Sequence, residues 1–447
     1  YGSRTNCGRA HLYDITRAPS IYLTLMMVLR LSLALCLAAS TASVASDVGA
    51  ASCSDEDRSH SEEISLLQVA LDVNTERSQA DSPKTRSSFT AGAVPSFTVN
   101  LDEPPASRWN AVLDHYIKTG LLQALLADQM HQPSMTAEYK KLWKAAIQEQ
   151  IDDEYKEEAR GMIEYIRDHV PEFKKMGDNY TADDLLLSSF MYEQNYPEFC
   201  AGVLAAMPNG TVIHGRNMDY PLRIPWNGTS IGWPELTVLV TFTRGGQPLF
   251  TSVNWPLQLG IHTAMRFGGW TFEQNTRRTG NDMLENLAAI QHGALGFVLT
   301  ARRLMEQVPD FETAVHKLWS ANMASSQYFI MSGAKPYEGA VLSIDRFGKH
   351  MSGTPPLMKL SKPFWHMVQT NDDINKPAPA EDPRRPMEEL KLSSTSQTQV
   401  SHSWMLGQLR SSPLFNSQTA FSWVAMPATG YFEIQLPPDT VEIHASE

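Results

Sequence analysis

Basic residues, cysteines and long apolar segments are all scarce in this sequence of 447 residues. Its 37 Lys and Arg residues are outnumbered by 49 Asp and Glu residues, which gives a formal net charge of −12. Because a nucleic-acid-binding protein normally carries a basic patch, we expect no nucleic-acid partner. The apolar run from Leu31 to Ala39 is too short to span a bilayer comfortably. No internal repeat is evident.

The N-terminal residues have the pattern of a targeting segment. Arg30 precedes the apolar run, and small residues follow it up to Ala45, which is typical of a secretory signal peptide. Residues 1–25 contain no methionine, so we expect a start at Met26 or Met27, with a longer authentic N-terminus as the alternative. We therefore predict a leader and signal peptide over residues 1–45.

The next segment, residues 46–94, is rich in Ser, Asp, Glu and Thr and has one short apolar patch. Its low hydrophobicity predicts a disordered pro-segment. The whole chain is 42% hydrophobic, so the remainder is long enough to bury a core of one large or two ordinary domains.

Apolar spacing divides that remainder into a helical part and a part rich in strands. Apolar residues recur at helical spacing from Trp109 to Leu125, and Thr181 with Asp184 has the pattern of a capping box. The other expected helices are 138–169, 283–307 and 311–319, and the expected strands are 236–243, 249–255, 261–271, 326–333, 339–345 and 364–370.

A hairpin is predicted where Phe199-Cys200 begins one apolar run and an Arg-Asn-x-Asp sequence ends the next. Asn209-Gly210 favours a two-residue type I′ turn. That turn would place Cys200 opposite Asp219, with their Cβ atoms about 4.5–5.5 Å apart. The same alternation turns Arg216 to the other face, unless a bulge or a shifted register intervenes.

Cys200 has two interpretations. A free cysteine most often packs as a small apolar residue. Alternatively, it is a nucleophile whose thiolate is favoured by a nearby guanidinium. A papain-like site would need a partnered histidine and a local cysteine signature, and neither surrounds Cys200.

Residues 193–221, which end in His-Gly-Arg-Asn-Met-Asp-Tyr-Pro, closely resemble the cleavage site and first hairpin of the acid ceramidase and N-acylethanolamine acid amidase family. These are lysosomal N-terminal-nucleophile hydrolases. The resemblance implies that the chain cuts itself between Phe199 and Cys200. It also implies that Cys200 attacks the substrate amide, with its α-amine as the base and Asp219 and Arg216 orienting the pair.

The resemblance extends over most of the chain from Pro95 onward. Asn371 and Arg384 match the family's oxyanion-hole asparagine and a following active-site arginine, whereas the same segment alone would read as a strand end and a Pro-rich loop. The implied fold class is α+β, an αββα sandwich. Residues 95–199 would be a mainly helical small (alpha) subunit and residues 200–447 the catalytic (beta) subunit, together a heterodimer of self-cleaved subunits.

Two departures from the family pattern are informative. The family tends to have Asn-Glu-Arg where this chain has Thr276 between Asn275 and Arg277, which affects fine tuning of substrate or pH response and not the reaction class. Acid ceramidases join their subunits by a disulfide. Here the cysteines are Cys7, Cys36, Cys53 and Cys200, of which Cys36 lies in the predicted signal peptide and Cys200 is the nucleophile. No pair remains for that disulfide, which favours the amidase branch, as does the Lys-Pro-Ala-Pro run that begins at Lys376.

The sequence thus predicts an acid amidase that hydrolyses fatty-acyl amide lipids, with N-acylethanolamines preferred. Ceramide hydrolysis and an inactive lipid-binding relative are the alternatives. We expect no cofactor and no metal, glycosylation at Asn179 and Asn227, and a lysosomal or secreted protein. Leu121 to Leu126 allows a transient contact with a membrane surface, although a buried helix face is the commoner role of such residues.

Overall fold

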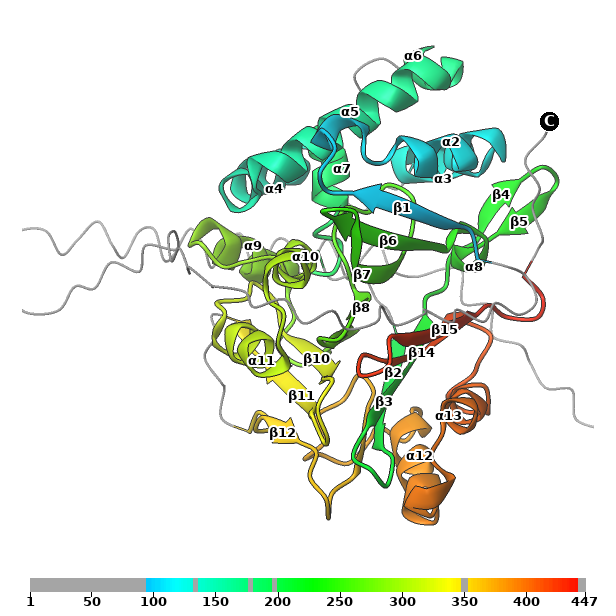
Figure 1. The fold of residues 1–447 in the computed structure, drawn as a ribbon. Coiled ribbons are helices and arrows are strands. Elements are labelled where there is room, and N and C mark those ends of the chain that lie inside the picture. The colour runs from blue at the N-terminus through cyan, green and yellow to red at the C-terminus, as the bar shows by residue number, and fades with distance from the viewer. Residues whose placement is uncertain (1–93, 132–135, 176–179, 195–198, 347–352, 441–447) are drawn as a thin grey trace, which may run out of the picture. The chain divides into compact units, whose positions relative to one another are not determined.

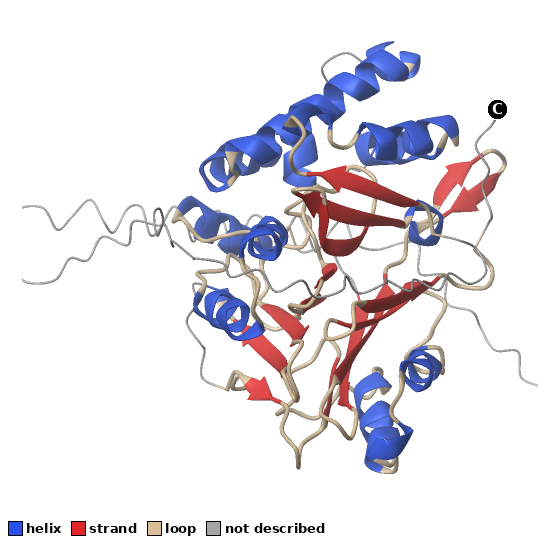
Figure 2. Ribbon diagram, viewed as in Figure 1, coloured by secondary structure: helices blue, strands red, loops and turns tan. Residues whose placement is uncertain are grey.

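Two β-sheets packed face to face form the centre of the computed structural model, which describes residues 94–131, 136–175, 180–194, 199–346 and 353–440 (Figure 1). The predicted leader, the signal peptide, nearly all of the predicted pro-segment and the sequon residue Asn179 lie outside the described residues. Helices lie on the outer sides of the two sheets (Figure 2). The protein is therefore of the mixed α+β class that the sequence predicts.

The larger sheet has eight strands in the order β1-β6-β7-β8-β9-β10-β11-β12. The strands are β1 (Ser96–Asn100), β6 (Val238–Arg244), β7 (Gln247–Asn254), β8 (Thr263–Arg266), β9 (Thr271–Thr276), β10 (Gln327–Ser332), β11 (Gly339–Ile344) and β12 (Met358–Lys359). Strand β1 runs parallel to β6, and the other neighbours are antiparallel. The segment that precedes Cys200 therefore supplies an edge strand to the sheet that follows Cys200.

The smaller sheet has five antiparallel strands in the order β13-β2-β3-β14-β15. They are β13 (His366–Gln369), β2 (Phe199–Ala206), β3 (Val212–Asp219), β14 (Thr419–Met426) and β15 (Tyr431–Gln435). A separate hairpin consists of β4 (Ile224–Trp226) and β5 (Thr229–Ile231). Strands β2 and β3 lie inside the sheet, and almost every residue of both is buried, which explains the nearly continuous apolar sequence of β2. Strand β3 also buries polar side chains, those of His214, Arg216, Asn217 and Asp219.

Alternate residues of the two sheets meet in a shared core. Leu204 and Val212 of the smaller sheet pack with Ile330 and Val341 of the larger sheet. The opposite side of the smaller sheet is covered by α12 (Arg384–Ser393) and α13 (His402–Leu409), with η5 (Gln397–Gln399) between them. Successive side chains of a strand point to opposite faces, so β2 and β3 contribute to both cores.

Further helices cover the larger sheet. Before Cys200 they are η1 (Pro105–Ser107), α2 (Asn110–Lys118), α3 (Leu121–His131), α4 (Ala137–Ile147), η2 (Gln148–Gln150), α5 (Asp153–His169), α6 (Pro171–Lys175) and α7 (Ala182–Ser188). After it come α8 (Trp233–Leu236), α9 (Met283–Gln291), α10 (Phe297–Gln307) and α11 (Phe311–Ser320). The predicted capping box at the start of α7 is confirmed, because Asp184 accepts the backbone N–H of Thr181 at 2.8 Å.

Four predicted elements are wrong in extent. The helix expected from Trp109 to Leu125 is divided between α2 and α3, where Gly120 adopts a φ of +76°. The single helix over 138–169 is divided by η2, and the one over 283–307 is divided where Gly293 adopts a φ of +83° after α9. The single strand over 261–271 is instead the β8–β9 hairpin, whose turn contains Gly268 at a φ of +65°. A glycine at positive φ marks the division in every case except that of η2.

A buried ion pair connects α5, before Cys200, to α10, after it. Arg302 makes two contacts of 2.7 Å with the carboxylate of Glu158, and both side chains are fully buried. Breaking a buried pair leaves an uncompensated charge, which typically costs about 3–5 kcal/mol. The pair therefore resists separation of the two segments.

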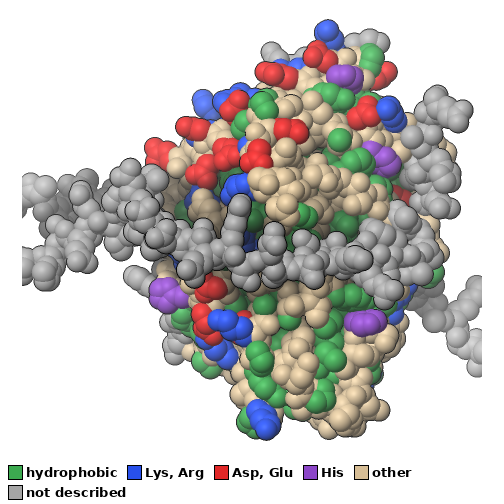
Figure 3. Space-filling model, in the orientation of Figure 1, with side chains coloured by type: hydrophobic (Ala, Val, Ile, Leu, Met, Phe, Trp, Pro, Cys, Tyr) green, Lys and Arg blue, Asp and Glu red, His purple; other side chains and the backbone are tan. Residues whose placement is uncertain are grey.

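On the face shown in Figure 3, acidic and basic side chains are interspersed over the helical part of the molecule. Within the part of the chain that the structure describes, no helix is long and apolar enough to cross a membrane. The side chains of Leu121 and Leu122 are buried, as are those of Leu125 and Leu126, so these four residues form part of the core in this structure.

Candidate active site

The hairpin that carries Cys200 has a three-residue turn. The amide of Met207 donates to the carbonyl of Thr211 at 2.8 Å, which leaves Pro208, Asn209 and Gly210 as the loop. Gly210 has a φ of +88°, whereas Asn209 is absent from the positive-φ residues of the described chain. This is the common loop in which a type I turn precedes a left-handed residue, and not the predicted type I′ turn.

The additional turn residue shifts the register by one. Cys200 pairs with Met218, and Asp219 pairs with Phe199. The prediction that Cys200 lies opposite Asp219 is therefore wrong. The same shift pairs Arg216 with Gly202, so Arg216 and Cys200 share a face of the sheet. The shifted register left open by the sequence is thus the one that the protein adopts.

Arg216 contacts the thiol directly. Its Nη2 lies 3.3 Å from the Sγ of Cys200 and 2.9 Å from the Sδ of Met218, and all three side chains are fully buried. Its Nη1 donates to the backbone carbonyl of His262 and to the Oγ1 of Thr263. A guanidinium beside a sulfur favours the thiolate form, which is the nucleophile.

Behind Arg216 lie buried polar groups from the larger sheet. The Oε2 of Glu273 is 2.7 Å from the Nε2 of His214, and its Oε1 is 4.0 Å from the Nε of Arg216. Burial, followed by the charge of Arg216, holds the pKa of His262 well below its ordinary value. Glu273 and His262 were not predicted as site residues, because their approach to β3 depends on how the two sheets pack.

Asn371 and Arg384 hold the backbone of Cys200. The Oδ1 of Asn371 accepts the Cys200 N–H at 3.0 Å, and the Nη1 of Arg384 donates to the Cys200 carbonyl at 3.0 Å. Arg384 also donates from Nη2 to the Oδ1 of Asn371 at 2.9 Å. The amide nitrogen of Asn371 donates to the carbonyl of Thr276 at 2.9 Å, so its donor side does not face the thiol in this uncut chain.

The side chain of Asp219 lies on the opposite face of the sheet from the thiol. Arg384 links it to the backbone of Cys200. Its carboxylate accepts from Thr419 at 2.7 Å, from Asn416 at 2.8 Å and from Arg384 at 3.5 Å. Burial raises the pKa of Asp219 to about 6, and the charge of Arg384 and these hydrogen bonds oppose the rise only in part. The five predicted site residues are thus brought together. Arg216 lies at the thiol, Asn371 and Arg384 bind the Cys200 backbone, and Asp219 binds Arg384.

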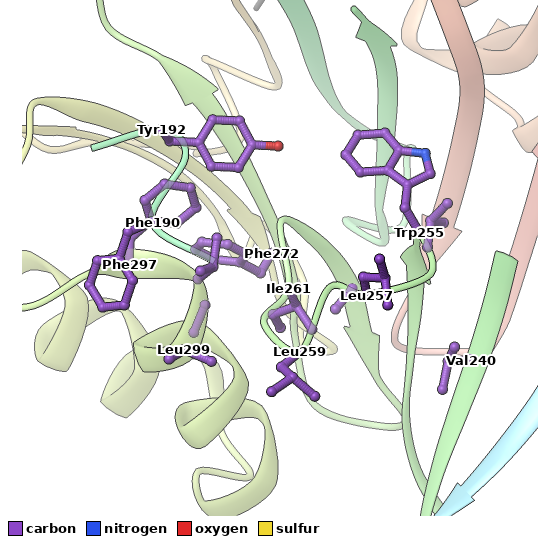
Figure 4. Close-up of a cluster of buried hydrophobic side chains, with 14 of the residues drawn as sticks. Phe190, Tyr192, Val240, Trp255, Leu257, Leu259, Ile261, Phe272, Phe297 and Leu299 are labelled. Atoms are coloured by element: carbon purple, nitrogen blue, oxygen red, sulfur yellow. The ribbon is translucent and has the colours of Figure 1, made fainter. Parts of the chain in front are cut away.

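A pocket of about 160 Å³ lies near this site. It is lined mainly by apolar and aromatic side chains from both sides of Cys200 in the sequence, among them Leu125, Leu187, Met191, Trp233 and Trp255. The ring of Trp255 lies 4.6 Å from the ring of His262, whose carbonyl binds Arg216. Figure 4 shows Trp255 beside Leu257, and Tyr192 beside Phe190 in the adjoining core. Trp255 of the pocket wall is therefore linked to the thiol through His262 and Arg216.

Within the described residues, no group of three His, Cys, Asp or Glu side chains is arranged to hold a metal ion. The fold and the site together define a mixed α+β protein with a buried cysteine on the first strand of a central hairpin and a buried arginine on the second.

Several known proteins are similar to this chain. A family model described as the beta subunit of N-acylethanolamine-hydrolyzing acid amidase matches residues 92–136. The N-acylethanolamine-hydrolyzing acid amidase of Oryctolagus cuniculus is 30% identical over 340 residues, which cover 75% of this chain and 87% of that protein. The acid ceramidase of Mus musculus is 25% identical over 364 residues, which cover 77% of this chain and 86% of that protein.

Among solved structures, a Caenorhabditis elegans ortholog of N-acylethanolamine-hydrolyzing acid amidase is 25% identical, with a TM-score of 0.45 over 54% of this chain and 95% of that one. The identity of 30% over most of both sequences shows that this chain belongs to the family of N-acylethanolamine-hydrolyzing acid amidases and acid ceramidases.

The matching family model names a beta subunit, whereas the sequence predicts that residues 95–199 form the small, alpha subunit. The division into subunits therefore stays a prediction.

Proposed function

We propose that this protein is a self-processed acid amidase that hydrolyses the amide bond of fatty-acyl lipids, with N-acylethanolamines as its preferred substrates. The observation that carries the proposal is the contact of 3.3 Å between Arg216 and the thiol of Cys200, at a residue whose N–H and carbonyl are both held by side chains. A structural cysteine needs only apolar packing and no such support.

The first reaction would be cleavage of the chain between Phe199 and Cys200. The Cys200 sulfur attacks the carbonyl carbon of Phe199, a C–S bond forms, the C–N bond breaks, and the thiol proton passes to the departing nitrogen. Water then hydrolyses the thioester, which regenerates the thiol and leaves a carboxylate on Phe199. The new α-amine titrates near about 7.7–8.0, so it can exchange protons close to neutrality.

Hydrolysis of a lipid amide would repeat these steps on an external substrate. Cys200 forms a thioester with the acyl group, its α-amine carries the proton to the leaving amine, and water releases the fatty acid. Arg216 balances the charge of the thiolate. Asn371 and Arg384 hold the backbone of Cys200, and Asp219 supports Arg384 from the side opposite the thiol.

The apolar and aromatic part of the pocket supports an acyl-chain substrate, because each buried methylene contributes about 0.8 kcal/mol, whereas Asp128, Lys140 and Asp184 give the rest of the lining a polar character. The amidase branch is favoured over the ceramidase branch by the higher identity to an amidase, 30% against 25%, and by the lack of a cysteine pair to join the subunits. The buried pair of Arg302 and Glu158 supports a heterodimer that holds together without a disulfide. A lysosomal or secreted location follows from the predicted signal peptide.

Acidification of purified protein, followed by N-terminal sequencing of the larger fragment, tests the cleavage. The expected first residue is Cys200, and Cys200→Ala should abolish both the cut and the hydrolysis. A different first residue, or full activity of the uncut chain, would contradict the mechanism.

The substrate is tested by competition between palmitoylethanolamide and a ceramide at acidic pH. A kcat/KM that favours ceramide tenfold, equivalent to about 1.4 kcal/mol, would assign the protein to the ceramidase branch. Failure of the matured enzyme to release fatty acid from any acyl amide would favour an inactive lipid-binding relative.

A further inference from the structure

The aromatic ring of Phe199 lies beside two guanidinium groups. The ring centroid is 5.0 Å from the Cζ of Arg278 and 5.7 Å from the Cζ of Arg384. A guanidinium over an aromatic face within about 6 Å is attracted by the ring quadrupole. Phe199 is the last residue before the proposed cut, and Arg278 has no part in the mechanism described above.

Two carboxylates keep the two positive charges close together. Asp382 lies 2.6 Å from the Nη2 of Arg384 and 3.4 Å from the Nη2 of Arg278, and Asp372 lies 3.5 Å from the Nη1 of Arg278. Burial alone would raise the pKa of Asp382, but its hydrogen bonds with Arg384 and the charge of that residue hold the pKa below its ordinary value. Asp382 therefore remains an anion between the two guanidiniums.

The same cluster fixes the peptide on the other side of the proposed cut. Arg384 contacts the Phe199 ring, donates to the Cys200 carbonyl and binds Asn371, which in turn accepts the Cys200 N–H. The side chain before the bond and the backbone after it are thus held by one group of residues. Holding reacting atoms in a fixed geometry removes much of the entropic barrier to a reaction.

We propose that the Phe199 ring and Arg278 form a positioning clamp for self-cleavage. The clamp presents the Phe199–Cys200 peptide to the thiol of Cys200. This inference rests on the proposed function, because it assumes that the chain cuts itself at this bond. It adds two determinants of that step, the Phe199 ring and Arg278. Both act through the geometry of the peptide and not through contact with the reacting atoms.

The clamp is tested by the cleavage rate of purified, uncut protein after acidification, followed by gel densitometry. Phe199→Leu keeps an apolar side chain but removes the π face, and it should slow the cut about tenfold. Phe199→Tyr keeps the π face and should cleave within about twofold of the wild type. Arg278→Gln should slow the cut about fivefold. Arg303→Gln, a matched control at an arginine paired with Asp152 on the surface, should leave the rate unchanged.

The double variant separates a clamp from a general structural effect. If Arg278 acts through the ring, Arg278→Gln should have no further effect in the Phe199→Leu background. Cleavage of Phe199→Leu at the wild-type rate would overturn the proposal, and so would independent, multiplying effects of the two substitutions. Failure of the wild-type chain to cut between residues 199 and 200 is a separate outcome, which would refute the proposed function itself.

Discussion

Replacement of Asp219 by asparagine should change how the stability of the uncut protein depends on pH. The carboxyl is fully buried, and burial raises its pKa from the ordinary value of 3.8 to about 6. The folded state therefore holds this proton more tightly than the unfolded chain does. A difference of about two pKa units corresponds to roughly 3 kcal/mol.

The sign follows from the direction of the shift. Below about pH 3 the carboxyl is protonated in both states, and folding does not bury a charge. As the pH rises toward and through 6, the unfolded chain loses the proton first, and the folded protein loses about 3 kcal/mol of stability. Asparagine has no proton to lose, so the variant should not show this loss.

Urea unfolding at pH 4, 5, 6 and 7 measures the effect, with Cys200→Ala in both proteins to prevent cleavage. Between pH 4 and pH 7 the free energy of unfolding of the protein with Asp219 should fall by about 2 kcal/mol relative to that of the Asp219→Asn variant, mostly below pH 6. All other carboxyl groups are shared and cancel in the comparison. A constant difference, or one that changes in the opposite direction, would refute the assignment of a raised pKa to Asp219.

Three further substitutions give defined expectations. Gly202→Ala should cost about 1–3 kcal/mol in urea unfolding, because its Cβ would lie 2.6 Å from the buried carboxylate of Glu273, whereas Gly407→Ala, with nothing within 4 Å, should not destabilise. Leu204→Ala should cost about 2–5 kcal/mol by the same assay, because the side chain fills the core between the sheets. Asn371→Ala should lower kcat for the release of fatty acid about 10²-fold. The Oδ1 of Asn371 accepts the N–H of Cys200, and aspartate keeps an oxygen at that position, so Asn371→Asp should recover most of that loss.

The sequence predicts the hairpin but not its turn. Asn209-Gly210 is compatible with both a two-residue and a three-residue loop. The observed three-residue loop also contacts a segment that is distant in the sequence. The Tyr337 N–H donates to the Gly210 carbonyl at 2.8 Å, and a Cβ on Gly210 would lie 2.6 Å from Pro336. Such contacts, more than a hundred residues away in sequence, are invisible to a local pattern.

The residues of the site likewise include some that the sequence indicates and one that it does not. Cys200, Arg216, Asn371 and Arg384 are recognisable from motifs, and the structure brings them together. Glu273 occupies a strand whose sequence does not indicate which face meets the smaller sheet. It supplies a buried carboxylate near Arg216, three residues before the position at which this chain has Thr276 in place of the family's glutamate.

Strand β1 likewise could not be predicted from its own sequence, because it depends on a distant segment. Its five residues follow a segment of low hydrophobicity and carry little signal of their own. They become a strand because β6, which begins about 140 residues later, offers a free edge. Pairings of that kind depend on the completed sheet and not on the sequence of the strand.

The length of the turn from Pro208 to Gly210 determines which side chains meet at the active site. Cys200 and Arg216 meet because an odd number of loop residues separates the two strands, and removal of one residue would turn Arg216 and Met218 toward α12 and α13 while the strands themselves could still pair. The thiol would then lose its guanidinium although no residue within six positions of it had changed. Relatives that differ by a single residue in this loop would accordingly need a compensating bulge to keep the same chemistry.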